Sequence, residues 1–209
     1  MNQYHKIQTV YLRDPDNHYK TLLDGQYAKP EFDYLRFCEW EWTEKVDGTN
    51  IRVMFDGETI TFGGKTDRAS IPAHLLNALN AQFLGLKARF VDQFPDGVCL
   101  YGEGYGAKIQ KGGGNYRLDQ AFVLFDVRIG DWWLERDNVL EIATDYGIDV
   151  VPFVGVGTLP EMVEFVRRGF VSKWGDFRAE GVVARPDTEL RSRNGSRIIT
   201  KLKCKDFAR

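Results

Sequence analysis

The sequence is poor in the residues that build metal and disulfide sites. Its 209 residues include only three cysteines and three histidines. Cys38, Cys99 and Cys204 lie far apart, and the absence of a Cys-x-x-Cys pair excludes the common zinc motifs. An odd number of widely spaced cysteines fits reduced thiols better than a disulfide framework, so we expect a cytoplasmic protein.

Long apolar runs are also missing. No stretch approaches the roughly 20 consecutive apolar residues of a membrane helix, and residues 1–20 lack the apolar core of a signal peptide. We therefore expect no membrane association. No internal repeat or Pro/Ser-rich linker divides the chain, which favours a single domain over residues 1–209.

Strong net charge is absent as well. A formal charge of −2 excludes a molecule that is basic overall, so a surface for nucleic acid must be local. Such a stretch exists between Arg185 and Arg209, where eight Lys or Arg residues stand against three acidic ones. It is suited to a phosphate backbone; the alternative is a solvated basic tail.

Hydrophobic residues make up 43% of the chain, enough for a packed core. Alternating apolar residues and turn signals predict strands over about 40–64, 97–106, 120–129, 150–155 and 180–203, with turns between the shorter ones. Helices are expected over about 70–90, 135–146 and 158–169. Because strands outnumber helices without regular alternation, we predict an α+β fold built on antiparallel sheets.

Local signals mark the helices. Thr158 and Glu161 have the spacing of a capping box at the start of the last helix. Gly147 is expected to end the middle helix in a left-handed conformation. In the first helix the apolar positions that share one face are Leu75, Leu76, Leu79 and Phe83.

The stretch EKVDGTN, residues 44–50, contains the pattern Lys-x-Asp-Gly-x-Asn beginning at Lys45. An Asp-Gly step is an ordinary hairpin signal, so this stretch alone fits an exposed lysine before a turn as well as a nucleophile. Four more motifs follow in order: YGEGYG with Glu103, FVLFDV with Phe125, AEGVVAR with Glu180, and KLKCKDF with Lys201 and Lys203. Taken alone, each motif also fits a purely structural role: a turn, core packing or a charge at a strand edge. The occurrence of all five motifs in this order is improbable by chance.

Together these motifs resemble the ordered motif set of the covalent nucleotidyltransferases, the polynucleotide ligases and mRNA capping enzymes. The resemblance covers residues 41–207. Asn50 stands where DNA ligases and capping enzymes usually carry arginine, and this is similar to the RNA ligase branch, especially the phage-type nick-sealing enzymes. The resemblance implies the nucleotidyltransferase (ligase adenylation) fold and an ATP-dependent RNA ligase.

The resemblance also implies roles for the motif residues. Lys45 is the nucleophile that becomes covalently linked to AMP, assisted by Lys201 and Lys203. Glu103 contacts the ribose hydroxyls and Phe125 stacks on the purine. Glu180 helps to hold the divalent metal, Mg²⁺ or Mn²⁺.

Further positions follow from the same resemblance. Glu44 and Val46 flank the nucleophile where the family reads the adenine edge, and Asp47 lies close behind it. Asn50 contacts the phosphate or the nick end.

Two matches leave alternatives open. A family arginine has Lys65 at its position here, with Arg68 nearby. Lysine lacks the two-point fork of arginine, so either Arg68 takes the role or Lys65 holds phosphate as a point charge. The lysine pair fits as Lys201/Lys203 or as Lys203/Lys205; the first pairing puts Phe207 at the family's aromatic position.

The required chemistry explains this residue set. A lysine attacks phosphorus only as the neutral amine, and nearby cations or burial favour that form. The same cations neutralise the triphosphate and the transferring phosphoryl group. Two lysines alternating on a strand, such as Lys201 and Lys203, can serve both needs.

The expected substrate is RNA with a 5′-phosphate and a 3′-hydroxyl, at nicks in RNA duplexes or RNA-containing duplexes. Beyond Phe207 no OB-fold or helical domain is expected, so binding to the nick is expected to be weak, salt-sensitive or dependent on a protein partner. A minimal DNA ligase or DNA/RNA repair ligase is the alternative enzyme. The alternative of another class is a non-catalytic nucleotide- or RNA-binding module.

Overall fold

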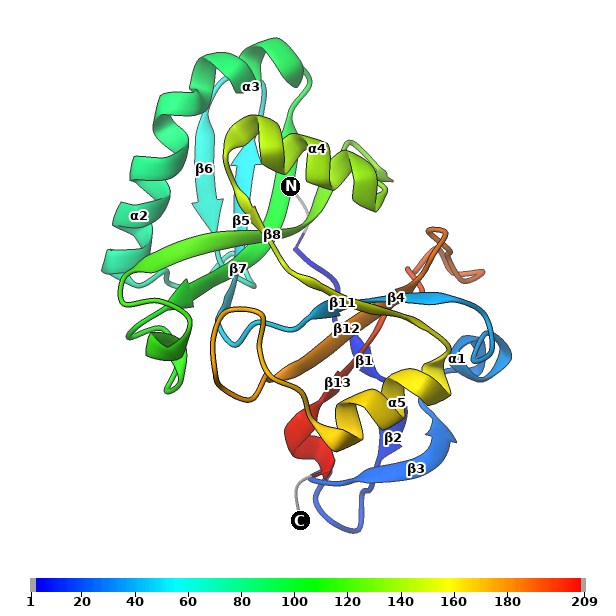
Figure 1. Ribbon diagram of the computed structural model, residues 1–209. Helices are drawn as coiled ribbons and strands as arrows, with labels where there is room; N and C mark the ends of the chain where they lie inside the picture. The colour runs from blue at the N-terminus through cyan, green and yellow to red at the C-terminus, as the bar shows by residue number, and fades with distance from the viewer. Residues whose placement is uncertain (1–2, 208–209) are drawn as a thin grey trace. The chain divides into compact units, whose positions relative to one another are not determined.

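The computed structural model describes residues 3–207, so Arg209 of the basic stretch lies outside the described residues. The chain forms two compact units, which are described separately below. Unit 1 contains residues 3–5 and 47–151, and unit 2 contains residues 6–46 and 152–207. Both are built on mainly antiparallel sheets with few helices, which confirms the predicted α+β class (Figure 1).

Unit 1 is organised around one sheet with the strand order β10-β8-β7-β5-β6, in which β9 also pairs with β8. The strands are β5 (Thr49–Phe55), β6 (Ile60–Gly63), β7 (Val98–Gly106), β8 (Gln120–Ile129), β9 (Trp132–Trp133) and β10 (Asp149–Val150). All these pairs are antiparallel except β10 with β8, which is parallel.

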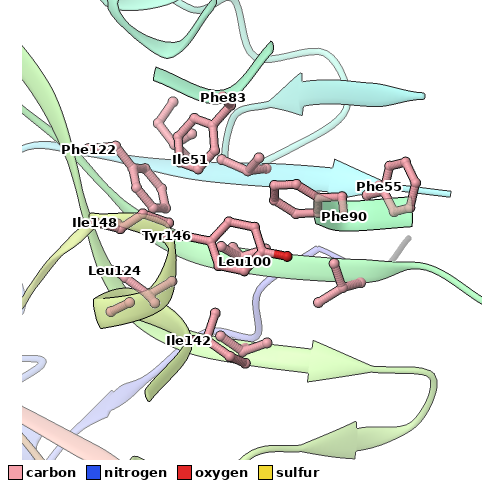
Figure 2. Packing of buried hydrophobic residues seen from close by; sticks show 14 of the residues in the cluster. Ile51, Phe55, Phe83, Phe90, Leu100, Phe122, Leu124, Ile142, Tyr146 and Ile148 are labelled. Carbon is pink, nitrogen blue, oxygen red and sulfur yellow. The ribbon is translucent and has the colours of Figure 1, made fainter. Parts of the chain in front are cut away.

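Helices bury one face of this sheet. They are α2 (Ala73–Phe83), η1 (Leu84–Leu86), α3 (Lys87–Gln93) and α4 (Arg136–Tyr146); the short η2 (Gly113–Asn115) lies in a loop. Figure 2 shows side chains such as Ile51, Leu100 and Phe122 packed against Phe83 and Phe90. This face supplies the core of the unit.

Two of the helix expectations can be compared with the structure. Gly147 ends α4 with φ 64°, as predicted. Leu75, Leu79 and Phe83 are buried in α2, but the inclusion of Leu76 on that face was wrong because it is 36% exposed. Leu76 directly follows Leu75, and at 3.6 residues per turn it points to the margin of the buried stripe.

The opposite face of the sheet carries polar and aromatic side chains. Cross-strand pairing places Asn50 of β5 beside Glu103 of β7, and Glu103 beside Val123 of β8. A register shift next to Gly102 leaves one additional residue, Phe125, in β8. Such a β-bulge interrupts the strict alternation of a strand and re-aims its side chains.

Unit 2 contains a second sheet with the order β1-β13-β12-β4-β11, in which only β1 and β13 are parallel. Its strands are β1 (Gln8–Thr9), β4 (Trp40–Glu44), β11 (Phe153–Gly157), β12 (Gly181–Pro186) and β13 (Thr200–Lys203). The unit also holds the hairpin β2 (Tyr11–Arg13) and β3 (Leu22–Tyr27), and the helices α1 (Pro30–Tyr34), α5 (Leu159–Arg168) and η3 (Cys204–Phe207).

Helix α5 begins with the predicted capping box. The Thr158 hydroxyl accepts from the Glu161 N–H, and the Glu161 carboxylate accepts from the Thr158 N–H at 2.8 Å. The bond from the Thr158 N–H to this carboxylate, and a second from the Thr158 hydroxyl, lower the pKa of Glu161. The buried side of α5 packs against Trp40 and Leu202 of the sheet.

The structure bears on the expectations about disulfides and membrane-spanning helices. All three cysteines are free thiols. No helix within residues 3–207 is long and apolar enough to cross a membrane.

We predict that Gly102→Ala lowers the free energy of unfolding by about 2 to 3 kcal/mol, because overpacking forces side chains and backbone apart. A Cβ at this position would lie 2.3 Å from both the Phe122 ring and the Val123 carbonyl oxygen. Urea titration measures the change. Gly85→Ala is the control, since a Cβ there meets nothing within 4 Å. Equal stability of the two variants would contradict this packing.

Candidate active site

Three strand ends bring a charged cluster together in unit 2. The central strand β12 pairs antiparallel with β4 on one side and with β13 on the other. Lys45 directly follows β4, Glu180 directly precedes β12, and Lys203 ends β13. The register, with Gly181 opposite Lys203 and Val182 opposite Glu44, therefore places these three side chains at one edge of the sheet.

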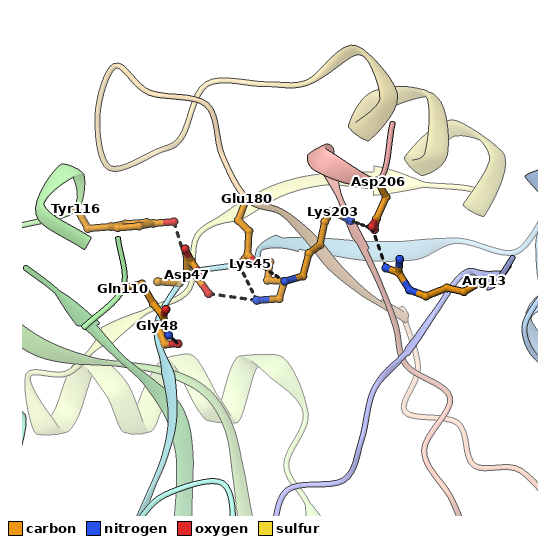
Figure 3. Close-up of polar contacts among 10 residues, drawn as sticks. Arg13, Lys45, Asp47, Gly48, Gln110, Tyr116, Glu180, Lys203 and Asp206 are labelled. Carbon is orange, nitrogen blue, oxygen red and sulfur yellow. Dashed lines mark hydrogen bonds and ion pairs between the residues drawn. The ribbon is translucent and has the colours of Figure 1, made fainter. Parts of the chain in front are cut away.

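The Glu180 carboxylate connects the two lysines (Figure 3). Its Oε2 accepts from Lys45 Nζ at 2.6 Å, and its Oε1 is 2.5 Å from Lys203 Nζ. All three side chains are mostly buried, with exposed fractions of 20% for Lys45, 11% for Glu180 and 24% for Lys203. The cluster thus gathers two cations around one anion where solvent can still enter.

Backbone bonds hold this edge of the sheet in place. The Lys45 N–H donates to the Gly181 carbonyl at 2.9 Å, and the Cys204 N–H donates to the Glu180 carbonyl at 2.8 Å. Gly181 has φ 155°, and a Cβ on it would lie 2.1 Å from the Leu202 carbonyl oxygen. Only glycine permits this close approach of β12 to β13 beside Glu180.

Lys203 has a second anchor. Its N–H donates to Asp206 Oδ2 at 3.1 Å, and Asp206 Oδ1 binds Arg13 Nη2 at 2.8 Å (Figure 3). Lys201 and Lys203 alternate with the buried Leu202 and so share one face of β13. Lys205 lies exposed in η3, so the structure puts Lys201 rather than Lys205 beside Lys203 on the strand.

Glu44 and Val46, the neighbours of Lys45, are both buried. Glu44 is 1% exposed and binds within its own unit: Oε1 accepts from the Ser172 hydroxyl at 2.6 Å, and Oε2 accepts from the Lys173 N–H at 2.8 Å. Both carboxylate oxygens therefore fix the loop after α5 to the end of β4.

We predict that Glu44→Ala lowers the free energy of unfolding by about 2 to 4 kcal/mol, because the Ser172 hydroxyl and the Lys173 N–H lose their acceptor. Thermal or urea denaturation measures this loss. Glu41→Ala is the matched control on the same strand, because the ion pair of Glu41 with Arg185 is long, at 3.9 Å. A Glu44→Ala protein as stable as this control would show that the buried bonds contribute little.

In unit 1, the segment after Lys45 runs beside Glu103. A Cβ on Gly48 would lie 2.7 Å from Glu103 Cγ, and Asn50 is paired with Glu103 across β5 and β7. The Oδ1 atom of Asn50 is buried and has no hydrogen-bond partner among the described residues. A buried acceptor of this kind fits a ligand that brings a donor to it.

Phe125, the bulge residue, lies on the face opposite the hydrophobic core. Its ring packs edge-to-face on Tyr4, with centroids 5.0 Å apart. Tyr4 is held in turn, because its hydroxyl donates to Asp126 at 2.5 Å. Phe125 is half-buried, so part of its ring remains accessible.

Lys65 and Arg68 are exposed in the loop that follows β6. This loop rests on Arg52, a fully buried arginine, whose Nε donates to the Gly64 carbonyl at 3.0 Å and whose Nη2 binds Asp67 at 2.7 Å. The bond from Arg52 lowers the pKa of Asp67. The sequence motifs did not single out Arg52, although it lies two residues after Asn50 on the same side of β5.

Two further contacts reach the residues that follow Lys45. The Asp47 N–H donates to the Tyr116 hydroxyl at 3.2 Å, and Gln110 Nε2 donates to the Gly48 carbonyl at 2.9 Å (Figure 3). Motif reasoning gave neither Gln110 nor Tyr116 a role.

The α+β fold is that of the nucleotidyltransferases of the ligase adenylation type, as the motifs predict. The chain belongs to the RNA ligase family, because residues 38–203 match the family model described as RNA ligase. A search of curated proteins found no match.

Solved structures of an RNA ligase from Naegleria gruberi share the fold. The structure with pyrophosphate has a TM-score of 0.69 at 18% identity, covering 97% of this chain and 56% of that one. A variant with ATP and Mn has a TM-score of 0.65 at 18% identity, covering 83% and 52%, and a variant with AMP and Mn has 0.69 at 17%, covering 97% and 56%. This chain therefore spans little more than half the length of the Naegleria protein.

Proposed function

We propose that this protein is an ATP-dependent RNA ligase that works through a lysyl-AMP intermediate. The observation that carries the proposal is the contact of Lys45 and Lys203 with the Glu180 carboxylate at one sheet edge. Membership of the RNA ligase family supports it, as do the Naegleria structures, which hold ATP, AMP, pyrophosphate and Mn.

In the first step, Lys45 Nζ attacks the α-phosphorus of ATP. A nitrogen–phosphorus bond forms, the bond from the α-phosphorus to the bridging oxygen breaks, and pyrophosphate leaves with that electron pair. The ion pair with Glu180 has to open and Nζ has to lose a proton before this attack. Lys203, with Lys201 on the same strand face, supplies positive charge for the phosphates.

Other residues are proposed to bind the nucleotide. Glu103 contacts the ribose hydroxyls, and the accessible part of the Phe125 ring stacks on the purine. Glu44, Val46 and Asp47 remain proposed contributors around the adenine edge and the nucleophile. For Glu44 this role would be indirect, through the loop that its carboxylate binds.

The substrate ends are proposed to meet Asn50 and Lys65. The buried Oδ1 of Asn50 lacks a donor among residues 3–207, and a 3′-hydroxyl at a nick would supply one. Lys65 is exposed in a loop that Arg52 fixes, so it suits a phosphate held as a point charge.

A divalent metal fits Glu180. Mg²⁺ and Mn²⁺ need oxygen ligands and commonly take one or two carboxylates together with substrate phosphates and water. The described residues contain no cluster of three or more metal-ligating side chains, so the nucleotide phosphates would complete the shell around Glu180. When bound, Mg²⁺ or Mn²⁺ would neutralise charge on the phosphates.

In the second step an oxygen of the 5′-phosphate attacks the AMP phosphorus, and the nitrogen–phosphorus bond to Lys45 breaks. In the third step the 3′-hydroxyl oxygen loses its proton and attacks the phosphorus of the 5′-phosphate, which forms the phosphodiester and releases AMP. We propose RNA nicks in duplexes as the substrate. The basic stretch offers fewer free charges than its composition suggests, because Arg197 forms a two-point ion pair with Glu189 at 2.6 and 2.8 Å. We propose modest affinity for the nick, or help from a protein partner.

We predict that the purified protein gains the mass of one AMP when incubated with ATP and Mg²⁺ or Mn²⁺, and that Lys45→Ala abolishes the gain because alanine has no nucleophile. Intact-protein mass spectrometry and transfer of label from α-labelled ATP measure the adduct. Lys87→Ala, an exposed lysine on α3, is the control and is expected to react normally. Equal labelling of Lys45→Ala and wild type would exclude Lys45 as the nucleophile.

We predict that nicked duplexes with RNA on the 3′-hydroxyl side are sealed faster than the all-DNA duplex. The physical reason is that A-form geometry and 2′-hydroxyls distinguish RNA. Gel analysis of four nicked duplexes, with RNA or DNA on each side of the nick, gives the relative rates. Sealing of DNA alone would identify a DNA ligase. An adduct that is never transferred to any end would instead indicate a nucleotide-binding module.

A further inference from the structure

The loop of residues 64–69, which follows β6 in unit 1, carries two cations beside one acid. Lys65 and Arg68 are exposed, and neither forms an ion pair within residues 3–207. Asp67 directly precedes Arg68 and lies two positions after Lys65, so it is the acid best placed in the chain to neutralise them. Its carboxylate is bound elsewhere.

Arg52 of β5 holds this carboxylate. Arg52 is 1% exposed, and its Nη2 lies 2.7 Å from Asp67 Oδ1. The other carboxylate oxygen, Oδ2, accepts from Gln3 Nε2 at 3.1 Å. Arg52 Nε also donates to the Gly64 carbonyl at 3.0 Å. One buried cation thus fixes the start of the loop and binds its only acid.

The strand pairing makes room for the Arg52 side chain. Arg52 is paired with Gly63 across β5 and β6, and a Cβ on Gly63 would lie 2.9 Å from Arg52 Nη2. The strand neighbours of Arg52, Ile51 and Val53, belong to the hydrophobic core. Because side chains alternate along a strand, Arg52 lies on the opposite face of the sheet, the one that carries Asn50.

The charges of these groups decide what the loop can bind. A buried cation has to be compensated, and Asp67 compensates Arg52. The two exposed cations of the loop, Lys65 and Arg68, therefore keep their full positive charge. Unpaired lysine and arginine side chains on a protein surface attract the phosphates of a nucleic-acid backbone.

We infer that Arg52 is a positioning residue for RNA binding. It withholds the Asp67 carboxylate from the two exposed cations, which are thereby available to phosphates of the RNA backbone. The inference rests on the proposed function, because it concerns the RNA substrate. It also joins the two alternatives left by the sequence: Lys65 binds a phosphate as a point charge, and Arg68 binds another with its fork.

The test measures the affinity for a nicked RNA duplex with a 5′-phosphate and a 3′-hydroxyl, by fluorescence anisotropy at several salt concentrations without ATP. Lys65→Ala and Arg68→Ala should each weaken binding about fivefold and lower the slope of log affinity against log salt by about one, because each removes one phosphate contact. Lys87→Ala, an exposed lysine on α3, is the matched control without change. Unchanged affinity in both loop variants would overturn the inference.

A double variant tests the part assigned to Arg52. Arg52→Met releases Asp67 and should also weaken duplex binding about fivefold, with a smaller salt slope. Arg52→Met/Asp67→Asn should recover most of the affinity, because the released anion is then absent. A purely structural role of Arg52 predicts no such recovery. If the double variant binds as weakly as Arg52→Met, or if the affinities only follow the melting temperatures, the inference is wrong.

The mass of the wild-type protein after incubation with ATP separates this inference from the proposed function. Wild-type protein that forms no lysyl-AMP, while Lys65→Ala and Arg68→Ala still lose duplex affinity, overturns the proposed function and leaves the phosphate-binding loop. Wild-type protein that forms lysyl-AMP, while the loop variants keep its duplex affinity, overturns the role of the loop and of Arg52 alone.

Discussion

The contact of one carboxylate with two lysines is the constraint on which the candidate site depends. Two ammonium groups at one sheet edge repel each other, and Glu180 compensates both, with an oxygen for each. Partial burial strengthens these interactions relative to open solvent. Because Glu180 stands just before the central strand β12, its position depends on pairing with both β4 and β13. A slip of one residue in either pairing would turn a side chain to the other face and separate the charges.

In this arrangement Lys45 and Lys203 can exchange Glu180 for another anion. The triphosphate of the proposed substrate carries several negative charges, so its arrival can replace Glu180 as the partner of the lysines. Lys45 is held by its backbone to Gly181, and Lys203 through Asp206, so the side chains can exchange partners while the strands stay in place. A stable sheet edge with exchangeable side-chain contacts is what phosphoryl transfer requires, since most of its catalysis is positioning and charge stabilisation.

The sequence predicted the features of the fold that depend on residues close together in the chain. The capping box of α5 and the end of α4 at Gly147 follow from signals within a few residues, and the α+β class follows from the order of the predicted strands and helices. The bulge at Phe125 and the buried role of Arg52 did not, because both depend on neighbouring strands. The contacts of Gln110 and Tyr116 join residues 62 and 69 positions apart, and no periodicity in the sequence indicates such pairs.

The Asp-Gly step after Lys45 shows how a local signal can mislead. It is typical of a hairpin turn, yet β4 and β5 belong to different sheets, and Gly48 is not among the glycines with positive φ. Glycine is needed at this position because of space: a Cβ would lie 2.3 Å from the Gly104 carbonyl oxygen. The motif therefore encodes a close approach of two backbones. That approach and the bonds from Gln110 and Tyr116 fix Asp47 and Gly48 at the start of unit 1.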